Sequence, residues 1–336
     1  MSKLVSVAEM RAIEQAADEL GLSYAQMLEN AGRGLAEAVF AHSHRGEKSV
    51  VALVGAGNNG SDALVALAAL GVAGWKTGAL LLGKRFSHDE YVKRARKAGA
   101  TIRSLDFDNH QTLDEHAEWL RGFGCVLDGI LGTGVRTPVR EPLARVMAAI
   151  KANVEITQPK PFIVAVDCPS GMDCDTGEVA PQALSADLTV CMGAVKYGML
   201  TLPAFGYLGE LVIADIGVTN RVRQWAEVKR HTLDEASVRE AVEVSQHVDA
   251  VLLDSGNPNL AVKELGGTGR AHDWQLSKAI REAINVPLFL AGGLNAGNVQ
   301  RAVDMVQPFG VDLCSGVRTN GRLDERKLES FFGALS

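Results

Sequence analysis

Apolar residues recur at intervals of three and four positions over the first forty residues of the chain. This spacing places them on one face of a helix, and it predicts two helices, at residues 6–22 and 23–41. The pattern then changes to short apolar runs that alternate with helical segments. The runs predicted as strands are SVVALV, TGALLL, CVLDGILG, FIVAVD, DLTVCMG and GELVIADIGV, and the segments predicted as helices are SDALVALAAL, HDEYVKRARKAG and PLARVMAAIKA.

Several of these strands are continuously apolar and do not alternate with polar residues. Strands of this kind belong to parallel sheets that are covered by helices on both faces. The sequence therefore predicts an α/β fold, a Rossmann-like three-layer α/β/α sandwich, over residues 1–218. In such a sheet the ligand lies beyond the carboxyl ends of the strands.

The chain after this point predicts a second domain, residues 219–336, built from four strand and helix pairs. Four such pairs are half of an eight-stranded βα barrel, whose usual length is about 250 residues. A (βα)4 half barrel leaves two open edges and an apolar inner face. We expect it to close against a second copy or against the first domain, and a homodimer would bury both edges. The predicted pairs are QWAEVKR with ASVREAVEVSQ, VDAVLLDSG with WQLSKAIREA, VPLFLAGGLN with AGNVQRAVDMV, and GVDLCSG with ERKLESFFGAL.

The composition narrows the class of protein. The chain of 336 residues is 47% hydrophobic and carries a formal charge of −6. A chain without a basic stripe is not expected to have nucleic acid or an anionic membrane as its main partner. The N-terminus has no signal-peptide core, and no apolar run approaches the length that spans a membrane. Five cysteines without a C-x-x-C pair suit free thiols, so we expect a cytoplasmic protein.

A glycine-rich turn follows the first predicted strand. Gly55, Gly57 and Gly60 fit the spacing G-x-G-x-x-G of dinucleotide-binding turns, and a phosphate could sit on the helix that follows. An NAD-dependent dehydrogenase also needs an acidic residue at the end of the next strand. That strand ends in Gly83, Lys84 and Arg85, so a standard NAD site is disfavoured, although the two cations could face a 2′-phosphate.

Polar side chains gather where three predicted strands end, and they share an oxygen-rich character. Oxygen ligands of this kind favour an alkali or alkaline-earth cation over a transition metal. The set contains no histidine, which disfavours a zinc-hydroxide mechanism and a Ser-His-Asp triad. The set consists of Asn58, Asn59 and Asp62, then Asp128 with the glycine turn 132–134, then Asp167 and Ser170.

Residues 1 to about 218 resemble the NAD(P)H-hydrate epimerase family, also known as the YjeF N-terminal domain. The resemblance is carried, in the family's order, by MLENAG, GAGNNGSDALVALA, VLDGILGTGVRTP, VAVDCPSGMDCDTGEV and AVKYGMLTLPAFGYLGELVIADIGV. It implies epimerisation of the R and S forms of hydrated NADH and NADPH, with potassium as the cofactor. It further implies that Asn59, Asp128 and Ser170 bind potassium. The substrate-binding residues that it implies are Asn58, Asn59, Gly60, Ser61, Asp62, Gly132, Thr133, Gly134, Val135, Arg136, Thr137, Pro138 and Asp167.

The implied chemistry assigns one catalytic residue. The hydrate is a hemiaminal, so loss of its hydroxyl leaves a cation that nitrogen stabilises and that water can enter from either face. We expect Asp167 to be the acid that assists departure and the base that activates return. Simpler interpretations stay open: Asn58 and Asn59 as turn residues, Asp128 and Asp167 as helix caps, and Lys196 as a structural or solvated residue.

One departure from the family pattern concerns the glycine-rich turn. The family usually reads G-N-N-G-G-D-G, whereas Ser61 and Ala63 replace two of these glycines here. The added side chains stand where the backbone could need a close approach to the ligand. Weaker binding, an altered substrate and lost activity are all compatible with this change. A non-catalytic nucleotide-binding or scaffold protein is therefore the rival interpretation.

Residues 220 to 336 resemble the second half of phosphoribosylanthranilate isomerase, through VDAVLLDSG, ELGGTGRAHDW, PLFLAGGLNAGNVQRAV and PFGVDLCSGVRTNGRLD. The resemblance implies that Asp254 matches the general acid and Asp312 a substrate-side carboxylate. The motif V-K-I-C-G, which holds the general base of that family, does not occur in the chain. We therefore expect no isomerase activity unless another chain completes the barrel, and a natural fusion and an engineered chimera both fit the sequence. The candidate phosphate-binding residues are Gly292, Gly293, Ser315 and Gly316.

Overall fold

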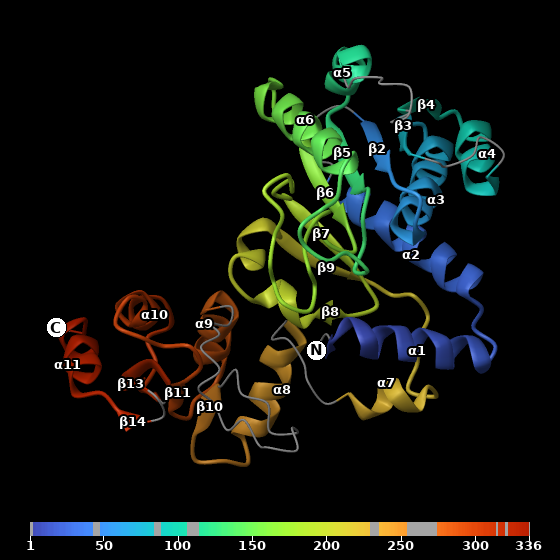
Figure 1. The fold of residues 1–336 in the computed structure, drawn as a ribbon. Coiled ribbons are helices and arrows are strands. Elements are labelled where there is room, and N and C mark those ends of the chain that lie inside the picture. The colour runs from blue at the N-terminus through green and yellow to red at the C-terminus, as the bar shows by residue number, and fades with distance from the viewer. Residues whose placement is uncertain are drawn as a thin grey trace. The chain divides into compact units, whose positions relative to one another are not determined.

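The computed structural model describes residues 3–42, 48–83, 89–105, 114–228, 235–253, 274–313, 315–319 and 322–335. The chain divides into two compact units. The first unit is Leu4–Val228, and the described elements of the second unit run from Glu235 to Gly333 (Figure 1).

The first unit is built on a seven-stranded sheet with the order β4-β3-β2-β5-β6-β7-β9. All neighbouring strands of this sheet are parallel. The order reverses between β2 and β5, which is the topological switch point where open α/β sheets bind their ligands. The strands are β2 (Ser49–Val54), β3 (Lys76–Leu82), β4 (Thr101–Leu105), β5 (Cys125–Gly129), β6 (Phe162–Val166), β7 (Leu188–Met192) and β9 (Glu210–Ala214).

Helices cover both faces of this sheet. Successive side chains of a strand point to opposite faces, and the apolar side chains on both faces are buried under helices. In β2, Val50, Ala52 and Val54 belong to the core formed with α1 to α4, whereas Val51 and Leu53 belong to the core beside α5 and α6. The three-layer α/β/α sandwich is confirmed. The helices of this unit are α1 (Val7–Glu19), α2 (Tyr24–Ala41), α3 (Asn58–Val72), α4 (Glu90–Lys97), α5 (Asp114–Arg121), α6 (Leu143–Ile156) and α7 (Arg223–Glu227).

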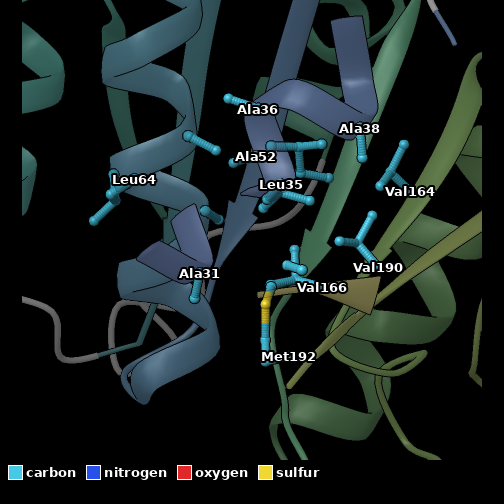
Figure 2. Packing of buried hydrophobic residues seen from close by; sticks show 14 of the residues in the cluster. Ala31, Leu35, Ala36, Ala38, Ala52, Leu64, Val164, Val166, Val190 and Met192 are labelled. Carbon is cyan, nitrogen blue, oxygen red and sulfur yellow. The ribbon is translucent and has the colours of Figure 1, made fainter. Parts of the chain in front are cut away.

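The packing of α2 explains why its apolar residues recur at intervals of three and four positions. Figure 2 shows Ala31 and Leu35 of α2 in one apolar cluster with Val166 and Val190 of the sheet. Helix α2 also lies against α3 at Gly32, where an added Cβ would be 2.4 Å from the Cβ of Val65. Only glycine permits the two helices to approach so closely.

A short parallel pair fixes the N-terminus of this unit. Strand β1 (Leu4–Val5) pairs with β8 (Val195–Lys196), with Leu4 opposite Val195 and Val5 opposite Lys196. Two 3₁₀ turns follow β8, at Tyr197–Leu200 and Ala204–Tyr207. Helix α1 then begins at a capping box, because the Ser6 hydroxyl accepts from the Glu9 amide and the Glu9 carboxylate accepts from the Ser6 amide.

The second unit contains three described strands, β10 (Val251–Leu253), β11 (Leu288–Leu290) and β12 (Gly310–Val311), in one parallel sheet. The strand and helix alternation of a βα half barrel is present in this part. A short antiparallel pair, β13 (Arg318–Thr319) with β14 (Arg322–Leu323), comes before the last helix and was not predicted. The helices are α8 (Glu235–Ser245), α9 (Trp274–Ala283), α10 (Val299–Val306) and α11 (Glu325–Gly333), and Ser315–Val317 is a 3₁₀ turn.

The prediction of a strand in QWAEVKR is wrong. Residues 223–227 form α7, which belongs to the first unit, and residues 229–234 lie outside the described part of the chain. The Arg223 guanidinium donates to the Glu227 carboxylate at 2.7 Å, which is an i,i+4 pair available only to a helix. Trp225 packs against the core that contains α1. Among the described residues the half barrel therefore has three strands.

None of the helices in the described ranges combines the length and the apolar character that crossing a membrane requires.

Candidate functional site

A cavity of about 1100 Å³ opens at the switch point of the sheet. Its walls come from the turn after β2, the loop after β5, the end of β6 and the N-terminal helices α1 and α2. The described lining includes Arg11, Glu14, Tyr24, Gly57, Asn58, Asn59, Ser61, Asp62, Tyr91, Gly132, Thr133, Gly134, Val135, Asp167 and Lys196.

The glycine-rich turn after β2 is shaped by contact with the loop after β5. The Gly55 amide donates to the Gly129 carbonyl at 3.0 Å, and a Cβ on Gly55 would lie 1.8 Å from the Ile130 carbonyl oxygen. Gly55 therefore permits two strand ends to meet. Gly57 is the N-cap of α3, and the space where its side chain would stand is open. The start of α3 thus faces the cavity, as a helix that binds an anion would.

Asn59 links three loops through its amide. Its Nδ2 donates to the carbonyls of Val166 at 2.5 Å and Leu131 at 3.3 Å. Its Oδ1 consequently points toward Gly132, where a Cβ would lie only 2.4 Å away. Gly132 is thus required so that the Asn59 carbonyl can keep this position.

Asp128 and Ser170 form the buried floor beside Asn59. The Ser170 amide donates to Asp128 Oδ2 at 2.8 Å, the Ser170 hydroxyl donates to Asp128 Oδ1 at 2.5 Å, and the Leu131 amide donates to Ser170 Oγ at 2.9 Å. Burial raises the pKa of Asp128, although the two hydrogen bonds from Ser170 act in the opposite direction. No cationic side chain in the described ranges pairs with this carboxylate.

The oxygen atoms of Asn59, Asp128 and Ser170 have the chemistry that suits a potassium ion. Asn59 and Ser170 both contact the Leu131 carbonyl, so their oxygens and those of Asp128 lie around one backbone segment. The donor set is entirely oxygen, and it contains one carboxylate that no cationic side chain of the described ranges pairs with. Hard oxygen ligands with a single negative charge suit a large monovalent cation. Among the described residues no group of three or more His, Cys, Asp or Glu side chains forms a site for another metal.

Asp167 occupies a strained position at the end of β6. Its φ is 65°, in the left-handed region that few residues other than glycine adopt. Its Oδ1 accepts from the Met192 amide at 2.9 Å and from the Lys196 ammonium. No described residue donates to Oδ2, while the residue itself lines the cavity. One carboxylate oxygen is therefore fixed, and the other is available to a ligand.

Lys196 is fully buried and forms an ion pair with Asp167. Burial lowers the pKa of this lysine, but the adjacent Asp167 carboxylate raises it, so that the pKa lies above its ordinary value overall. Lys196 is therefore a charged residue of the site, and the interpretation as a solvated residue is wrong. No local pattern marks this role, because the lysine follows an apolar strand by only a few residues.

The loop after β5 contributes only its first half to the cavity. Thr133, Gly134 and Val135 line it, whereas Arg136 turns to Asp173 at 3.4 Å and Asp175 at 3.0 Å. Thr137 donates to Glu178, and neither Thr137 nor Pro138 is part of the described lining; Gly60 is also absent from it. Asp175 also accepts from the amide of Val7, so this loop region is linked to the start of α1.

The two departures from the family pattern have different surroundings. Ser61 lines the cavity, whereas Ala63 is completely buried in the core and is not part of the lining. An added Cβ on Gly129 would lie 3.1 Å from the Cβ of Ala63. Of the two, only Ser61 can contact a ligand.

Helix α1 supplies two charged residues that sequence reasoning missed, Arg11 and Glu14. Burial raises the pKa of Glu14, and the negative charge of Asp167 raises it further, while Lys196 and Arg11 lower it. These residues lie more than 150 positions before Asp167, and helical periodicity shows only that they flank the apolar face of α1.

The cysteines beside Asp167 are buried. Cys168 and Cys174 lie in an apolar cluster, and a hydrogen bond with Cys174 together with burial raises the pKa of Cys168 well above its usual range. A thiolate is therefore disfavoured at this position.

The candidates of the second unit lie on two neighbouring loops. Gly292 and Gly293 follow β11 with φ of 84° and 64°, and a Cβ on Gly316 would lie 2.0 Å from the Leu294 carbonyl oxygen. The glycines after β11 and β12 therefore allow these loops to meet. Asp312 is exposed, Ser315 begins the 3₁₀ turn after β12, and Asp254 lies outside the described residues, as do Lys84, Arg85 and Cys314.

Comparison with known families gives one match for each part of the chain. Residues 24–198 match the family described as YjeF-related protein N-terminus. Residues 217–334 match the family described as N-(5'phosphoribosyl)anthranilate (PRA) isomerase.

Curated relatives follow the same division. An NAD(P)H-hydrate epimerase of Clavibacter michiganensis subsp. michiganensis is 37% identical over 58% of this chain and 83% of its own length. A bifunctional NAD(P)H-hydrate repair enzyme Nnr of Pyrobaculum aerophilum is 33% identical over 65% of this chain and 42% of its own. An N-(5'-phosphoribosyl)anthranilate isomerase of Methanothrix thermoacetophila is 49% identical over 27% of this chain and 42% of its own. The chain thus spans less than half the length of the last two relatives.

A solved structure supports the fold of the first unit. The crystal structure of the yeast protein YNL200c superposes with a TM-score of 0.50 at 24% identity, and the match covers 63% of this chain and 87% of the yeast chain.

Proposed function

Because the chain belongs to the family described as YjeF-related protein N-terminus, we propose that its first unit is an NAD(P)H-hydrate epimerase. In this proposal it interconverts the R and S forms of hydrated NADH and NADPH and thereby repairs damaged cofactor. The observation that carries the proposal is Oδ2 of Asp167, to which no described residue donates, at a cavity that the N-terminus of α3 also lines.

The dinucleotide would extend from the start of α3 to Asp167. Its diphosphate suits the α3 N-terminus at Gly57 and Asn58, since this helix end favours negative charge. The loop segment Thr133–Gly134 lies on the same cavity wall. This arrangement leaves the hydrated ring for the region of Asp167 and the N-terminal helices.

The chemistry follows from the hemiaminal carbon of the hydrate. Departure of the hydroxyl requires a proton, and return of water requires a base. Asp167 can serve in both roles, because its Oδ2 is not engaged by a described residue. The strained backbone and the anchored Oδ1 hold this second oxygen in one direction, which is the kind of positioning that proton transfer needs.

Potassium would be held by Asn59, Asp128 and Ser170. When bound, it supplies a fixed positive charge that neutralises the Asp128 carboxylate and stiffens the loops around it. These residues connect the ends of β2, β5 and β6 by hydrogen bonds, so the ion would organise the cavity without touching the reacting carbon.

An assay of the R epimer of hydrated NADPH tests the proposal. A dehydratase that consumes only the S epimer reports each epimerisation event, and potassium is compared with lithium. We expect potassium-dependent consumption that Asp167→Asn abolishes and that the exposed control Asp18→Asn retains. Consumption at the spontaneous rate by folded wild-type protein would contradict the proposal.

A nucleotide-binding scaffold without turnover is the second candidate, and Ser61 favours it. This side chain stands in the cavity where the family usually has glycine. Binding of NADPH without any epimerisation, measured by calorimetry on the same protein, would support this candidate over the enzyme.

For the second unit we propose phosphate binding at the loops of Gly292, Gly293, Ser315 and Gly316, with no isomerase activity in this chain alone. An isomerase subunit completed by another chain is the alternative, and sedimentation with a separate N-terminal half barrel distinguishes the two. We further propose a cytoplasmic homodimer that uses neither nucleic acid nor membrane, and sedimentation of the chain alone tests the dimer.

A further inference from the structure

Epimerisation at the hydrated carbon has a geometric requirement. The oxygen leaves from one face of the ring and returns to the opposite face. A single carboxyl fixed to the protein reaches one face of a bound ring. Unless the ring turns over inside the site, a second proton donor and acceptor is needed on the other face.

Three carboxyl groups line the described part of the cavity: Glu14, Asp62 and Asp167. Asp62 lies in α3 beyond its first turn, and it is one of the charges that act on Tyr91 of α4. Glu14 comes from α1, and its electrostatic interactions are with Asp167, Lys196 and Arg11. Helix α1 directly follows β1, whose Val5 lies opposite Lys196, so Glu14 comes from the element beside the Lys196–Asp167 ion pair.

The surroundings of Glu14 and Asp167 differ in charge. The buried Lys196 ammonium forms an ion pair with Asp167. Burial and the charge of Asp167 raise the pKa of Glu14, while Lys196 and Arg11 have smaller opposing effects. Tyr24 also lines the cavity, and burial and then the charge of Glu14 raise its pKa. A carboxyl with a raised pKa beside a carboxylate that is paired with a lysine is an arrangement suited to an acid and a base.

We propose that Glu14 is a second catalytic acid–base, which serves the face of the hydrated ring opposite to Asp167. This inference rests on the proposed epimerase function. Glu14 protonates the departing hydroxyl, the C–O bond breaks, and water leaves while the ring nitrogen shares its electron pair with the carbon. Water then adds from the other face and gives its proton to Asp167. The reverse reaction starts with the proton on Asp167 and ends with it on Glu14, so atoms and charge balance in both directions.

Oxygen exchange separates this role from a structural one. Wild-type protein and Glu14→Gln are incubated with each separate epimer in H₂¹⁸O, with potassium present. For Glu14→Gln we expect epimerisation to fall by about 10²- to 10⁴-fold. The variant should still introduce ¹⁸O into one epimer without inversion, because Asp167 can release and return oxygen on its own face.

The controls make each outcome decisive. Glu19→Gln changes an exposed carboxyl on the same helix outside the described lining, and it should match the wild type in both measurements. Epimerisation by Glu14→Gln within threefold of the wild type would overturn the role of Glu14. Equal loss of epimerisation and of exchange in both epimers, from a folded variant, would also overturn it. A wild-type protein without epimerisation would instead contradict the proposed function itself.

Discussion

Ser170 donates two hydrogen bonds to Asp128, one from its amide and one from its hydroxyl, and each carboxylate oxygen receives one of them. The two residues lie at the ends of neighbouring strands, β5 and β6. Their contact therefore fixes the positions of the loops after β5 and β6 relative to each other. It also leaves a buried carboxylate whose charge no described side chain balances.

This uncompensated charge predicts that potassium stabilises the protein. At a potassium concentration about 100-fold above its Kd, binding contributes roughly 2.7 kcal/mol, which is a rise in Tm of roughly 5 to 10 °C. Thermal unfolding in potassium and in lithium at equal ionic strength measures the effect. Asp128→Asn should remove the difference between the two salts. An equal Tm for the wild type in both salts would refute a potassium site.

Reversion of the two departures in the glycine-rich turn should separate binding from stability. Ser61→Gly alters the cavity wall, so we expect a changed KM for the hydrated dinucleotide. Ala63→Gly alters only the core and the helix, so we expect an unchanged KM and a loss of about 1 kcal/mol in the free energy of unfolding. Steady-state kinetics and urea unfolding of both variants test this contrast. The reverse assignment of the effects would show that Ala63 governs ligand access.

The ion pair of Lys196 and Asp167 predicts a large loss of stability when only one partner is removed. Lys196→Met leaves a buried carboxylate without its cation, which costs about 3 to 5 kcal/mol of the free energy of unfolding. Epimerisation should also be lost, because the Lys196 ammonium no longer fixes Oδ1 of Asp167. The double variant Lys196→Met with Asp167→Asn should recover part of the stability, and additive losses would show that the pair is not coupled.

The raised pKa of Glu14 predicts a definite sign for the pH dependence of stability. The folded state holds the Glu14 proton to a higher pH than the unfolded state does, so its stabilising effect is complete below pH 4.5 and is lost as the pH rises through the folded pKa. The stability of Glu14→Gln relative to the wild type should therefore increase from pH 4 to pH 7. Urea unfolding at several pH values measures this, and a constant difference would contradict the raised pKa.

The second unit predicts a negative result in a genetic test. Without the motif V-K-I-C-G the chain has no match for the general base of the isomerase, and a missing base costs about 10²- to 10⁴-fold in rate. The chain should fail to complement a strain that lacks phosphoribosylanthranilate isomerase. Growth without added tryptophan, lost again in Asp312→Asn, would show that the unit is active after all.

The sequence predicts the sheet of the first unit well, for a physical reason. The run SVVALV is apolar throughout and is bounded by polar residues and glycine, and it coincides with β2 to the residue. Strand β4 and helix α5 were not predicted, because TIRSL alternates weakly and DEHAEWLR is mostly polar. Helix α7 was predicted as a strand, since five residues are too few for periodicity to decide.

Only part of the candidate site could be predicted from the sequence. Asp128, Asp167 and Ser170 could be found because each follows a predicted strand directly, and parallel strands end at one edge. Glu14 and Lys196 could not be found in this way. Glu14 reaches the cavity only through the packing of α1, and the burial of Lys196 depends on a pairing with the first strand of the chain. Tertiary contacts of this kind leave no pattern in the local sequence.

The pairing of β1 with β8 also has a consequence for synthesis of the protein. Leu4 and Val5 are synthesised long before their partners Val195 and Lys196, which follow only after almost the whole first unit has been made. At 5 to 20 residues per second, this delay lasts roughly ten seconds or more. During that time β1 lacks its partner β8, so the part of the cavity lined by Lys196 is among the last parts of the first unit to form.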